Sequence, residues 1–559
     1  MDKIWIKNYP KNIKSQIDMS PNESIVSFFT QKAKNYSSHI AAECMGTSLT
    51  YKELDRLSTC FAQYCTIHLK LKKGDRIGIM SPNTLYYQVI LIGAFKAGLI
   101  VVGINPLYTA TELKNQVKDS GLKTIVALDF YAHIIQNVDI DLPFKNIILM
   151  SIGDGHKVIK GKLINFIARN IKKLVKPFQL ENAIYLNKIL SSKTTNNIES
   201  IEINGNDIAL IQYTGGTTGK PKGVILKHSN ILANIYQVSA CMKPIMGQND
   251  TWIAPLPLYH IFALTASLAT LNFGGKNIFI TNPRDLDSLI STIKKSNFSI
   301  IIGVNTLFCA LVNDKRFRKI NFSNLKVAWA GGMPVQEYVA EKWHSITKIP
   351  LHVAYGLSET SPGVSADFYN TPYFSHSVGF PLPNTDIEIR DINNGEVLPI
   401  GKSGEICVKG PQVTSGYWNN QEATESTIQN GWLKTGDIGI INTEGKLSII
   451  DRIKDMVIVS GFNVYTVEVE EVIGLIPEVL DVAVIGLPSN KTGEQLKAHI
   501  ILRPNREISK EEIIKHCRKH LTGYKVPKLI TFNTSLPLTP VGKILKTKLR
   551  KLPENNNIR

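Results

Sequence analysis

The sequence lacks the features of a secreted, disulfide-stabilised protein. Its seven cysteines contain no C-x-x-C pair and are odd in number. This distribution argues against a structural zinc site and indicates a reducing compartment. The N-terminus, MDKIWIKNYPKNIKSQ, has no apolar stretch of the kind found in secretory signals. We therefore expect a cytoplasmic protein.

Long apolar runs are also scarce. The most apolar run, residues 85–104, is interrupted by Lys96 and by three glycines. It is better interpreted as a buried helix followed by a strand than as a membrane span.

Acidic residues are outnumbered, with 46 Asp and Glu against 64 Lys and Arg, giving a net charge of +18. Such a charge can indicate nucleic acid or an anionic membrane as partner. Here the cations are spread along the chain among abundant Ile and Asn, and no nucleic-acid-binding motif is present. We therefore predict no nucleic-acid partner.

What is present is a composition typical of globular domains, with 559 residues, 43% of them hydrophobic and 20% charged. The length suggests roughly three or four domain-sized units. Residues 49–68 have the pattern of an amphipathic helix that Thr50 can cap. Apolar strands at 72–80 and 98–106 flank a helix at 83–97, and residues 122–128 repeat the strand pattern. This order predicts a doubly wound parallel sheet in the first half.

Residues 213–223, YTGGTTGKPKG, lie between two apolar strands and combine four glycines, three threonines and two lysines. Glycines let successive N–H groups converge on anionic oxygens, and the hydroxyls and cations add further donors. A flexible glycine turn is the alternative. A Walker A loop is excluded, because Thr214 replaces the first glycine and Pro221 follows Lys220. The predicted phosphate loop comprises Tyr213, Thr214, Gly215, Gly216, Thr217, Thr218, Gly219, Lys220, Pro221, Lys222 and Gly223.

Further candidate residues follow strands or glycine turns. Glu359 lies at the polar tip of the strand 353–360 and is a plausible Mg²⁺ ligand. The stretch 430–465 carries Asp437, Asp451 and Arg452, and a carboxylate is the usual partner of ribose hydroxyls. Lys543 follows a Pro/Gly-rich turn and is either a mobile catalytic cation or one more lysine of a basic tail. Residues 325–336 predict a strand, a glycine turn and a helix start with Pro334 in its first turn.

Two apolar segments have more than one interpretation. Residues 252–275 are apolar and rich in small side chains, which suits the lining of a pocket for an apolar ligand. His260 lies in this run, where histidines are usually structural. From Leu163 to Lys176, apolar residues share one helical face and cations the other. That helix either contacts the inner face of an anionic membrane or faces the core.

Four blocks in a fixed order resemble the adenylate-forming superfamily of acyl-CoA synthetases, luciferases and peptide-synthetase adenylation domains: YTGGTTGKPKG, YGLSET, TGD followed by IIDRIKDMVIVSGFN, and PVGKILK. NGWLKTGDIG, VGINPLYT, LPLYHIFALT and TGYKVPK are similar to the bacterial long-chain-fatty-acid–CoA ligases. The resemblance covers essentially the whole chain. It implies an α/β fold with a large N-terminal domain (1–453) of doubly wound sheets plus a small β-barrel-like subdomain. A small mobile α+β domain (454–559) follows, with its hinge at Lys454.

The resemblance also implies a function and a set of roles. The function is ATP-dependent activation of long-chain fatty acids to acyl-CoA through acyl-AMP, with ATP, Mg²⁺ and coenzyme A. Residues 213–223 would hold the β- and γ-phosphates and Glu359 would bind Mg²⁺. Lys543 would contact the fatty carboxylate and the α-phosphate, His260 would belong to the catalytic set, and Gly461 would line the pantetheine passage. The ATP site would be completed by Gly331, Gly332 and Tyr355 at adenine, by Gly356 and Ser358, and by Asp437 and Arg452 at ribose.

Two positions depart from the family pattern. Ser358 replaces the commoner threonine but keeps its hydroxyl. Leu264 stands where some long-chain enzymes carry a tryptophan gate, so gating by that residue is not predicted.

Two other functions are weighed: an adenylation unit that serves a carrier protein, and a non-catalytic acyl- or nucleotide-binding protein. No carrier domain is expected after Arg559, and the apolar segment has no aspartate for an amino group. The retained loop, Glu359 and Lys543 argue against a non-catalytic role. A homodimer is left open.

Overall fold

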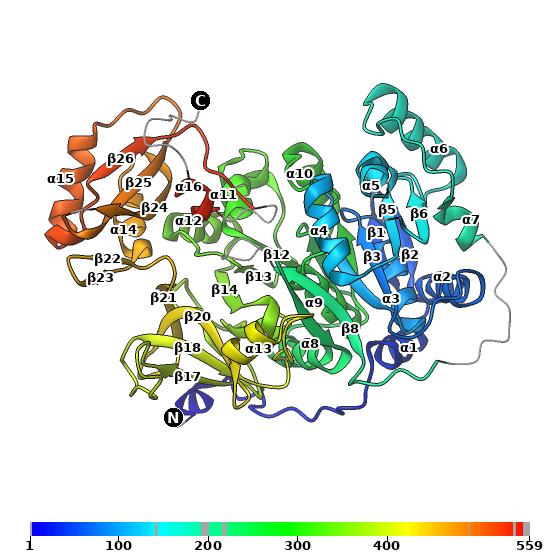
Figure 1. The fold of residues 1–559 in the computed structure, drawn as a ribbon, viewed down its shortest axis with the longest axis horizontal. Coiled ribbons are helices and arrows are strands. Elements are labelled where there is room, and N and C mark those ends of the chain that lie inside the picture. The colour runs from blue at the N-terminus through cyan, green and yellow to red at the C-terminus, as the bar shows by residue number, and fades with distance from the viewer. Residues whose placement is uncertain are drawn as a thin grey trace.

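A computed structural model describes residues 3–139, 143–191, 201–214, 221–489, 491–539 and 544–551. The described residues form four sheets in two lobes (Figure 1). Three sheets belong to the large lobe. The fourth lies in a small lobe built from residues after Arg452.

The first sheet has seven strands in the order β7-β6-β5-β3-β4-β8-β9, all parallel except β9. The predicted βαβ unit is present as β3, α3 and β4. Nearly every residue of α3 is buried, as its apolar sequence indicates. The strands are β3 (Arg76–Met80), β4 (Ile100–Ile104), β5 (Thr124–Leu128), β6 (Asn146–Met150), β7 (Ala183–Tyr185), β8 (Ile208–Thr214) and β9 (Lys222–Lys227). The associated helices are α2 (Tyr51–Gln63), α3 (Tyr87–Lys96), α4 (Ala110–Ser120), α5 (Ala132–Asp139) and α7 (Leu186–Leu190).

The predicted cap at Thr50 is confirmed. Its side chain accepts the N–H of Glu53, and Glu53 in turn accepts the N–H of Thr50, so the helix α2 starts with a capping box. A π-helical turn (Tyr64–His68) extends the helix to the predicted end.

The second sheet has nine strands in the order β16-β15-β14-β13-β12-β10-β11-β1-β2, of which the six from β14 to β1 run parallel. Its strands are β1 (Ile40–Cys44), β2 (Thr47–Thr50), β10 (Thr251–Ala254), β11 (Lys276–Phe279), β12 (Ile300–Gly303), β13 (Val327–Gly331), β14 (Leu351–Gly356), β15 (Gly363–Ala366) and β16 (Phe380–Pro381). Its helices are α1 (Ile25–Asn35), α8 (His228–Met242), α9 (Ile261–Asn272), α10 (Leu286–Lys295), α11 (Asn305–Asn313) and α12 (Glu337–Thr347).

The prediction that Pro334 lies in the first turn of a helix is wrong. Helix α12 begins at Glu337, with Gln336 as its N-cap. Asn305 on the neighbouring helix fixes this start, because its Oδ1 accepts the N–H of Gln336 at 3.0 Å and its Nδ2 donates to the Gln336 side chain at 3.2 Å. A contact distant in sequence therefore sets the boundary.

The third sheet is antiparallel and forms the small β unit expected after the doubly wound sheets. Its order is β17-β18-β20-β19, with β21 paired to β20. The elements are β17 (Asp386–Arg390), β18 (Gly404–Lys409), α13 (Gln421–Thr427), β19 (Ile428–Gln429), β20 (Trp432–Ile441) and β21 (Leu447–Arg452).

The small lobe is an α+β unit with its own valine- and isoleucine-rich core. It packs beside α11 and α12 of the large lobe (Figure 1). One contact between the lobes is the Arg503 guanidinium, which lies 5.0 Å from the ring centre of Tyr338 on α12. Its elements are β22 (Val457–Val459), β23 (Phe462–Val464), α14 (Thr466–Gly474), β24 (Val479–Ser489), β25 (Gly493–Leu502), α15 (Lys510–His520), β26 (Leu529–Phe532) and α16 (Lys546–Leu549).

Residues 157–176 form a projection at the edge of the large lobe, here called the basic projection (Figure 1). It contains α6 (Val158–Phe166) and a π-helical turn (Ile167–Ile171), so the helix predicted to reach Lys176 ends earlier. Arg169 pairs at 2.7 Å with buried Asp129 at the end of β5, which fastens the projection to the first sheet.

Most of the large apolar side chains of the basic projection face outward. Exposed fractions are 85% for Ile159, 55% for Phe166 and 65% for Ile171. The alternative of a core-facing helix therefore does not describe this segment. In the parts of the chain that are described, no helix has the length and apolar character needed to cross a bilayer.

Candidate functional site

The carboxyl ends of several strands meet at one place, as is usual for ligand sites in α/β proteins. In the nine-stranded sheet, β13 ends at Gly331 and β14 ends at Gly356, and Gly331 pairs with Ala354 in register. A short 3₁₀ helix, η6 (Ser358–Thr360), follows β14 directly. The structure therefore places the predicted residues 331, 332, 355, 356, 358 and 359 along one sheet edge.

The predicted phosphate loop connects β8 to β9. Tyr213 pairs with Gly223, and Thr214 pairs with Lys222, across an antiparallel hairpin. Gly215, Gly216, Thr217, Thr218, Gly219 and Lys220 lie outside the described residues. The hydroxyl of Tyr213 donates to Asp119 Oδ2 at 2.5 Å, which fixes the base of the hairpin against α4.

Glu359 faces this hairpin through Tyr417. The Tyr417 hydroxyl donates to Glu359 Oε1 at 2.8 Å, and Lys222 Nζ lies 5.1 Å from the centre of the Tyr417 ring. The strand-like segment 414–418 is fixed on both sides, since the N–H of Thr414 donates to Glu359 O at 2.8 Å and the N–H of Trp418 donates to Gly223 O at 2.7 Å. Burial, then the charge of Glu359, raises the pKa of Tyr417, so this phenol stays a donor.

The environment of Glu359 fits Mg²⁺ better than a metal that needs a protein cage. Among the residues that the structure describes, no three His, Cys, Asp or Glu side chains are grouped to hold a metal. Mg²⁺ commonly binds through one or two carboxylates together with phosphate oxygens. A half-buried carboxylate beside a predicted phosphate loop meets that requirement.

Asp437 is a buried carboxylate with both oxygens oriented. The Tyr355 hydroxyl donates to Asp437 Oδ2 at 2.7 Å, and Arg452 Nε lies 2.8 Å from Oδ1. The charge of Asp437 raises the pKa of Arg452, and burial followed by the same carboxylate raises the pKa of Tyr355. These three residues come from β14, β20 and β21. An oriented carboxylate of this kind can accept hydrogen bonds from vicinal hydroxyls.

Gly356 occupies a place where no side chain fits. A Cβ built there would lie 1.9 Å from the carbonyl oxygen of Pro362. Gly331 is also tight, with Phe262 Cζ at 3.1 Å from the equivalent position. The packing of the protein itself therefore requires glycine at position 356 and leaves little room for a side chain at position 331.

His260 is the residue before α9 and lies half-buried beside Tyr259, with ring centres 6.4 Å apart. Phe262, two residues later, is the side chain that touches Gly331, so His260 lies near the same edge. The predicted apolar segment lines a cavity of about 20 Å³ together with residues of β11 and β12, and Leu264 is buried in the core. This cavity is water-sized, so an acyl chain would have to displace side chains to enter here.

Lys454 and Gly461, two of the residues that the family resemblance assigns to the small lobe, lie at separate places in the structure. Lys454 lies between β21 of the large lobe and β22 of the small lobe; partial desolvation and then the charge of Arg452 lower its pKa to about 8. Gly461 lies at the exposed tip of the β22–β23 hairpin, with φ +83°, and a Cβ added there would meet no atom within 4 Å. Lys543 lies outside the described residues. Its neighbour Ile544 pairs with Leu538, and the N–H of Leu545 donates to Pro537 O at 2.7 Å.

Sequence reasoning missed Tyr417 and Thr414. Tyr417 is 58 positions from Glu359, and no local pattern marks it. The glycine-aromatic pair Gly416-Tyr417 is the one signal that sequence offers, and such pairs are common in ordinary turns.

Two doubly wound sheets, a small antiparallel sheet and a separate α+β lobe define the fold of the adenylate-forming enzymes. Residues 29–418 match the AMP-binding enzyme family, and residues 468–543 match the AMP-binding enzyme C-terminal domain. The chain belongs to the AMP-binding enzyme family.

Curated relatives match over nearly the full length. The long-chain-fatty-acid–CoA ligase of Escherichia coli O157:H7 is 43% identical over 552 residues, covering 98% of both chains. The ligase of the same name from Haemophilus influenzae (strain ATCC 51907 / DSM 11121 / KW20 / Rd) is 41% identical over 98% of both chains. That of Bacillus subtilis (strain 168) is 32% identical over 100% of this chain and 99% of its own.

Solved structures give the same fold. ATP-bound MatB from Rhodopseudomonas palustris superposes with a TM-score of 0.79 at 26% identity, covering 95% of this chain and 99% of its own. The anthranilate CoA ligase AuaEII superposes with a TM-score of 0.83 over 95% and 98% of the two chains, and at 22% identity it supports the fold alone.

Proposed function

We propose that this protein is a long-chain-fatty-acid–CoA ligase, which activates its substrate with ATP through an acyl-AMP intermediate and releases AMP and pyrophosphate. The observation that carries the proposal is 41–43% identity to ligases of this name over 98% of both chains. Contacts between three sheets support an ATP site, because Asp437 meets Tyr355 at the end of β14 and Glu359 meets Tyr417 beside the β8–β9 hairpin.

In the first step, a fatty carboxylate oxygen attacks the α-phosphorus and pyrophosphate leaves. Asp437 would accept hydrogen bonds from the ribose hydroxyls, held in place by Tyr355 and Arg452. Gly331, Gly332 and Tyr355 would enclose adenine, with Gly356 next to Tyr355. The hairpin from Tyr213 to Gly223 would hold the β- and γ-phosphates, with the Ser358 hydroxyl nearby.

Charge must be neutralised in this step, because two anions approach one another. Lys543 would lie against the carboxylate and the α-phosphate. Glu359 would hold Mg²⁺, which supplies charge stabilisation at the phosphate oxygens. Tyr417 would keep Glu359 oriented toward the hairpin.

In the second step, the CoA thiol sulfur attacks the acyl carbon, and the bond to AMP breaks. The thiol needs access to a face that the small lobe otherwise covers, so the lobe would rotate about Lys454 between the steps. The exposed hairpin at Gly461 would then line the pantetheine passage.

The competing functions are separated by a pyrophosphate-release assay with palmitate, a set of amino acids, or no acid. The proposal expects release with palmitate alone. Release with an amino acid alone would indicate a carrier-serving adenylation unit, and release with neither would indicate a non-catalytic binding protein.

Gly461→Leu is expected to slow thioester formation from synthetic acyl-AMP and CoA, and to leave acyl-AMP formation near the parent rate. The hairpin tip is exposed in the arrangement described here, so a leucine would obstruct pantetheine only after rotation. Half-reaction rates measured by rapid quench test this expectation.

Gly401→Leu is the matched control for Gly461→Leu. Gly401 has φ +84° and equally open surroundings in the turn between β17 and β18, so leucine there brings the same backbone strain without the proposed passage. Equal slowing of both half-reactions by Gly461→Leu, or an equal effect of Gly401→Leu, would contradict the assignment.

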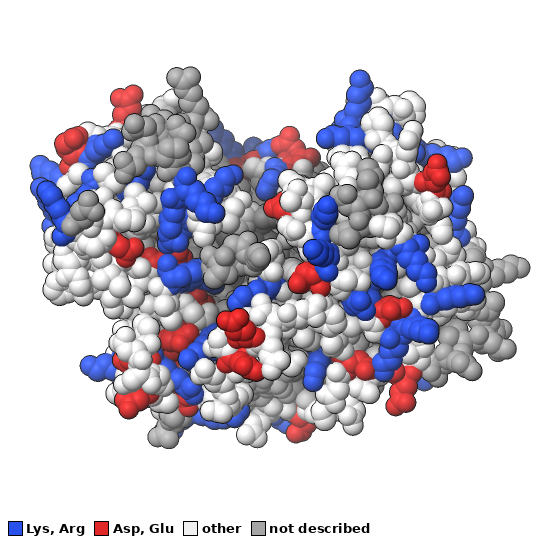
Figure 2. Space-filling view, viewed as in Figure 1, with Lys and Arg blue, Asp and Glu red and all other residues white. Residues whose placement is uncertain are grey.

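We also propose that the basic projection contacts the anionic inner face of the cytoplasmic membrane, where long-chain fatty acids partition. This segment carries both exposed apolar side chains and exposed lysines. Figure 2 shows Lys and Arg side chains on the part of the molecule where the basic projection lies. An interfacial segment of this kind buries apolar side chains shallowly while its cations meet lipid phosphates.

The double variant Lys172→Glu/Lys173→Glu is expected to weaken binding to anionic vesicles, since each cation near such a surface contributes roughly 1 kcal/mol. Activity on detergent-dispersed substrate should stay unchanged. Co-sedimentation with phosphatidylglycerol vesicles measures the effect. Lys294→Glu/Lys295→Glu, two adjacent lysines at the end of α10, is the control. Vesicle binding that is unchanged in the first variant, or equally reduced in the control, would contradict the proposal.

A further inference from the structure

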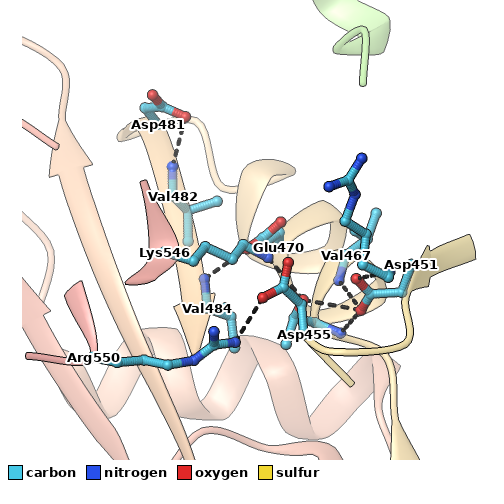
Figure 3. A network of polar contacts seen from close by, with 11 residues as sticks. Asp451, Asp455, Val467, Glu470, Asp481, Val482, Val484, Lys546 and Arg550 are labelled. Carbon is cyan, nitrogen blue, oxygen red and sulfur yellow. Dashed lines mark hydrogen bonds and ion pairs between the residues drawn. The ribbon is translucent and has the colours of Figure 1, made fainter. Parts of the chain in front are cut away.

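The small lobe contains a buried ion pair directly after the segment that carries Lys543. Lys546 Nζ lies 2.7 Å from Glu470 Oε1 and donates to Thr466 Oγ1 at 2.8 Å (Figure 3). Glu470 Oε1 also accepts the N–H of Val484 at 2.7 Å. Both charged side chains are less than 20% exposed. Burial would lower the pKa of Lys546, but the charge of Glu470 raises it above its ordinary value, so the cation persists.

This ion pair is connected to the large lobe through Asp451. The buried carboxylate of Asp451, at the end of β21, accepts from the N–H and, at 2.9 Å, from the hydroxyl of Thr466 at the start of α14. The N–H of Val467 donates to the same oxygen at 3.4 Å. On the adjacent residue, Arg452 pairs with Asp437. One strand end therefore contacts both the proposed ribose site and the anchor of the C-terminal segment.

Three further contacts hold the segment on either side of Lys546. Ile544 pairs with Leu538 in an antiparallel bridge, and Leu549 is buried against Ala483 and Ile485. Arg550 pairs at 2.7 Å with Asp455 in the turn that joins the two lobes (Figure 3).

We propose that Lys546 is a positioning residue for acyl-AMP formation. Its pairing with Glu470 and Thr466 fixes the chain three residues after Lys543 in a defined place relative to β21, so that the Lys543 cation meets the α-phosphate. The inference rests on the proposed function and on the role of Lys543 within it. A lysine that served only as a surface charge would need neither a buried acidic partner nor a contact with Thr466 at the start of α14.

The test compares half-reactions in Lys546→Met, which keeps side-chain length and removes the charge. Because a displacement of about 1 Å at a reacting group can cost on the order of 10²-fold, acyl-AMP formation should fall at least about tenfold. Thioester formation from synthetic acyl-AMP and CoA should stay near the parent rate. Lys546→Arg should restore most of the loss, and Glu470→Gln should reproduce it. Lys548→Met, an exposed lysine of the same helix, should have no effect.

The decisive comparison combines Lys546→Met with Lys543→Ala. If Lys546 acts only through Lys543, the double variant should form acyl-AMP no more slowly than Lys543→Ala alone, because interacting residues are non-additive. Losses that multiply, equal loss in both half-reactions, or no loss in Lys546→Met at an unchanged melting temperature would each overturn the proposal. If the parent chain itself forms no acyl-AMP from palmitate, the proposed function fails instead.

Discussion

Lys543→Ala is expected to slow acyl-AMP formation by roughly 10²-fold or more, which is the scale for losing one preorganised charge-stabilising donor. The cation would be needed only while the fatty carboxylate and the α-phosphate share the site. Thioester formation from synthetic acyl-AMP and CoA should proceed at near the parent rate, because the rotated lobe would have moved residue 543 away. Rapid-quench measurement of each half-reaction gives both rates.

An unchanged melting transition is the folding control for Lys543→Ala, and Lys548→Ala is the matched control for charge. Equal loss of both half-reactions in a folded Lys543→Ala protein would contradict the alternation of the small lobe between two arrangements. A normal rate of acyl-AMP formation would contradict the catalytic assignment itself.

Chain-length preference is the second large effect. Each buried methylene contributes about 0.8 kcal/mol, or about fourfold, so the eight methylenes that separate palmitate from octanoate set an upper bound of roughly 10⁴-fold to 10⁵-fold in kcat/KM. The figure is smaller if the fatty-acid site is full before the whole chain is buried, and if side chains must move to admit the chain. Side chains around the water-sized cavity between β10, α9 and β12 would have to move to admit the chain.

The chain-length expectation is checked by measuring kcat/KM for saturated acids from octanoate to palmitate. Efficiency should rise steeply with each pair of methylenes and then level off. If octanoate is used as efficiently as palmitate, the long-chain assignment is contradicted. The broader assignment as an acyl-CoA ligase would still hold.

Local patterns predicted local structure well. The Thr50 capping box, the βαβ unit around α3 and the hairpin that presents residues 213–223 all depend on neighbouring residues. Residue patterns marked Glu359, Asp437 and Arg452 as candidates, and the family resemblance gave them their roles. The structure places Asp437 between Tyr355 at the end of β14 and Arg452 at the end of β21.

Contacts between distant segments could not be predicted from local patterns. Tyr355 and Asp437 are 82 residues apart, yet they share a hydrogen bond. The start of α12 depends on Asn305, so Pro334 was a misleading signal. The outward orientation of Phe166 and Ile171 is set by the pairing of Arg169 with Asp129, since an amphipathic pattern alone does not say which face meets the protein.

We infer that this chain joins a long-chain fatty acid to CoA through acyl-AMP. The most direct measurement is mass spectrometry of the products formed by the purified protein with palmitate, ATP, Mg²⁺ and CoA. We expect palmitoyl-CoA, AMP and pyrophosphate in equal amounts, and palmitoyl-AMP when CoA is omitted. Formation of ADP and phosphate together with the thioester, or consumption of ATP without any acyl-CoA, would contradict this inference.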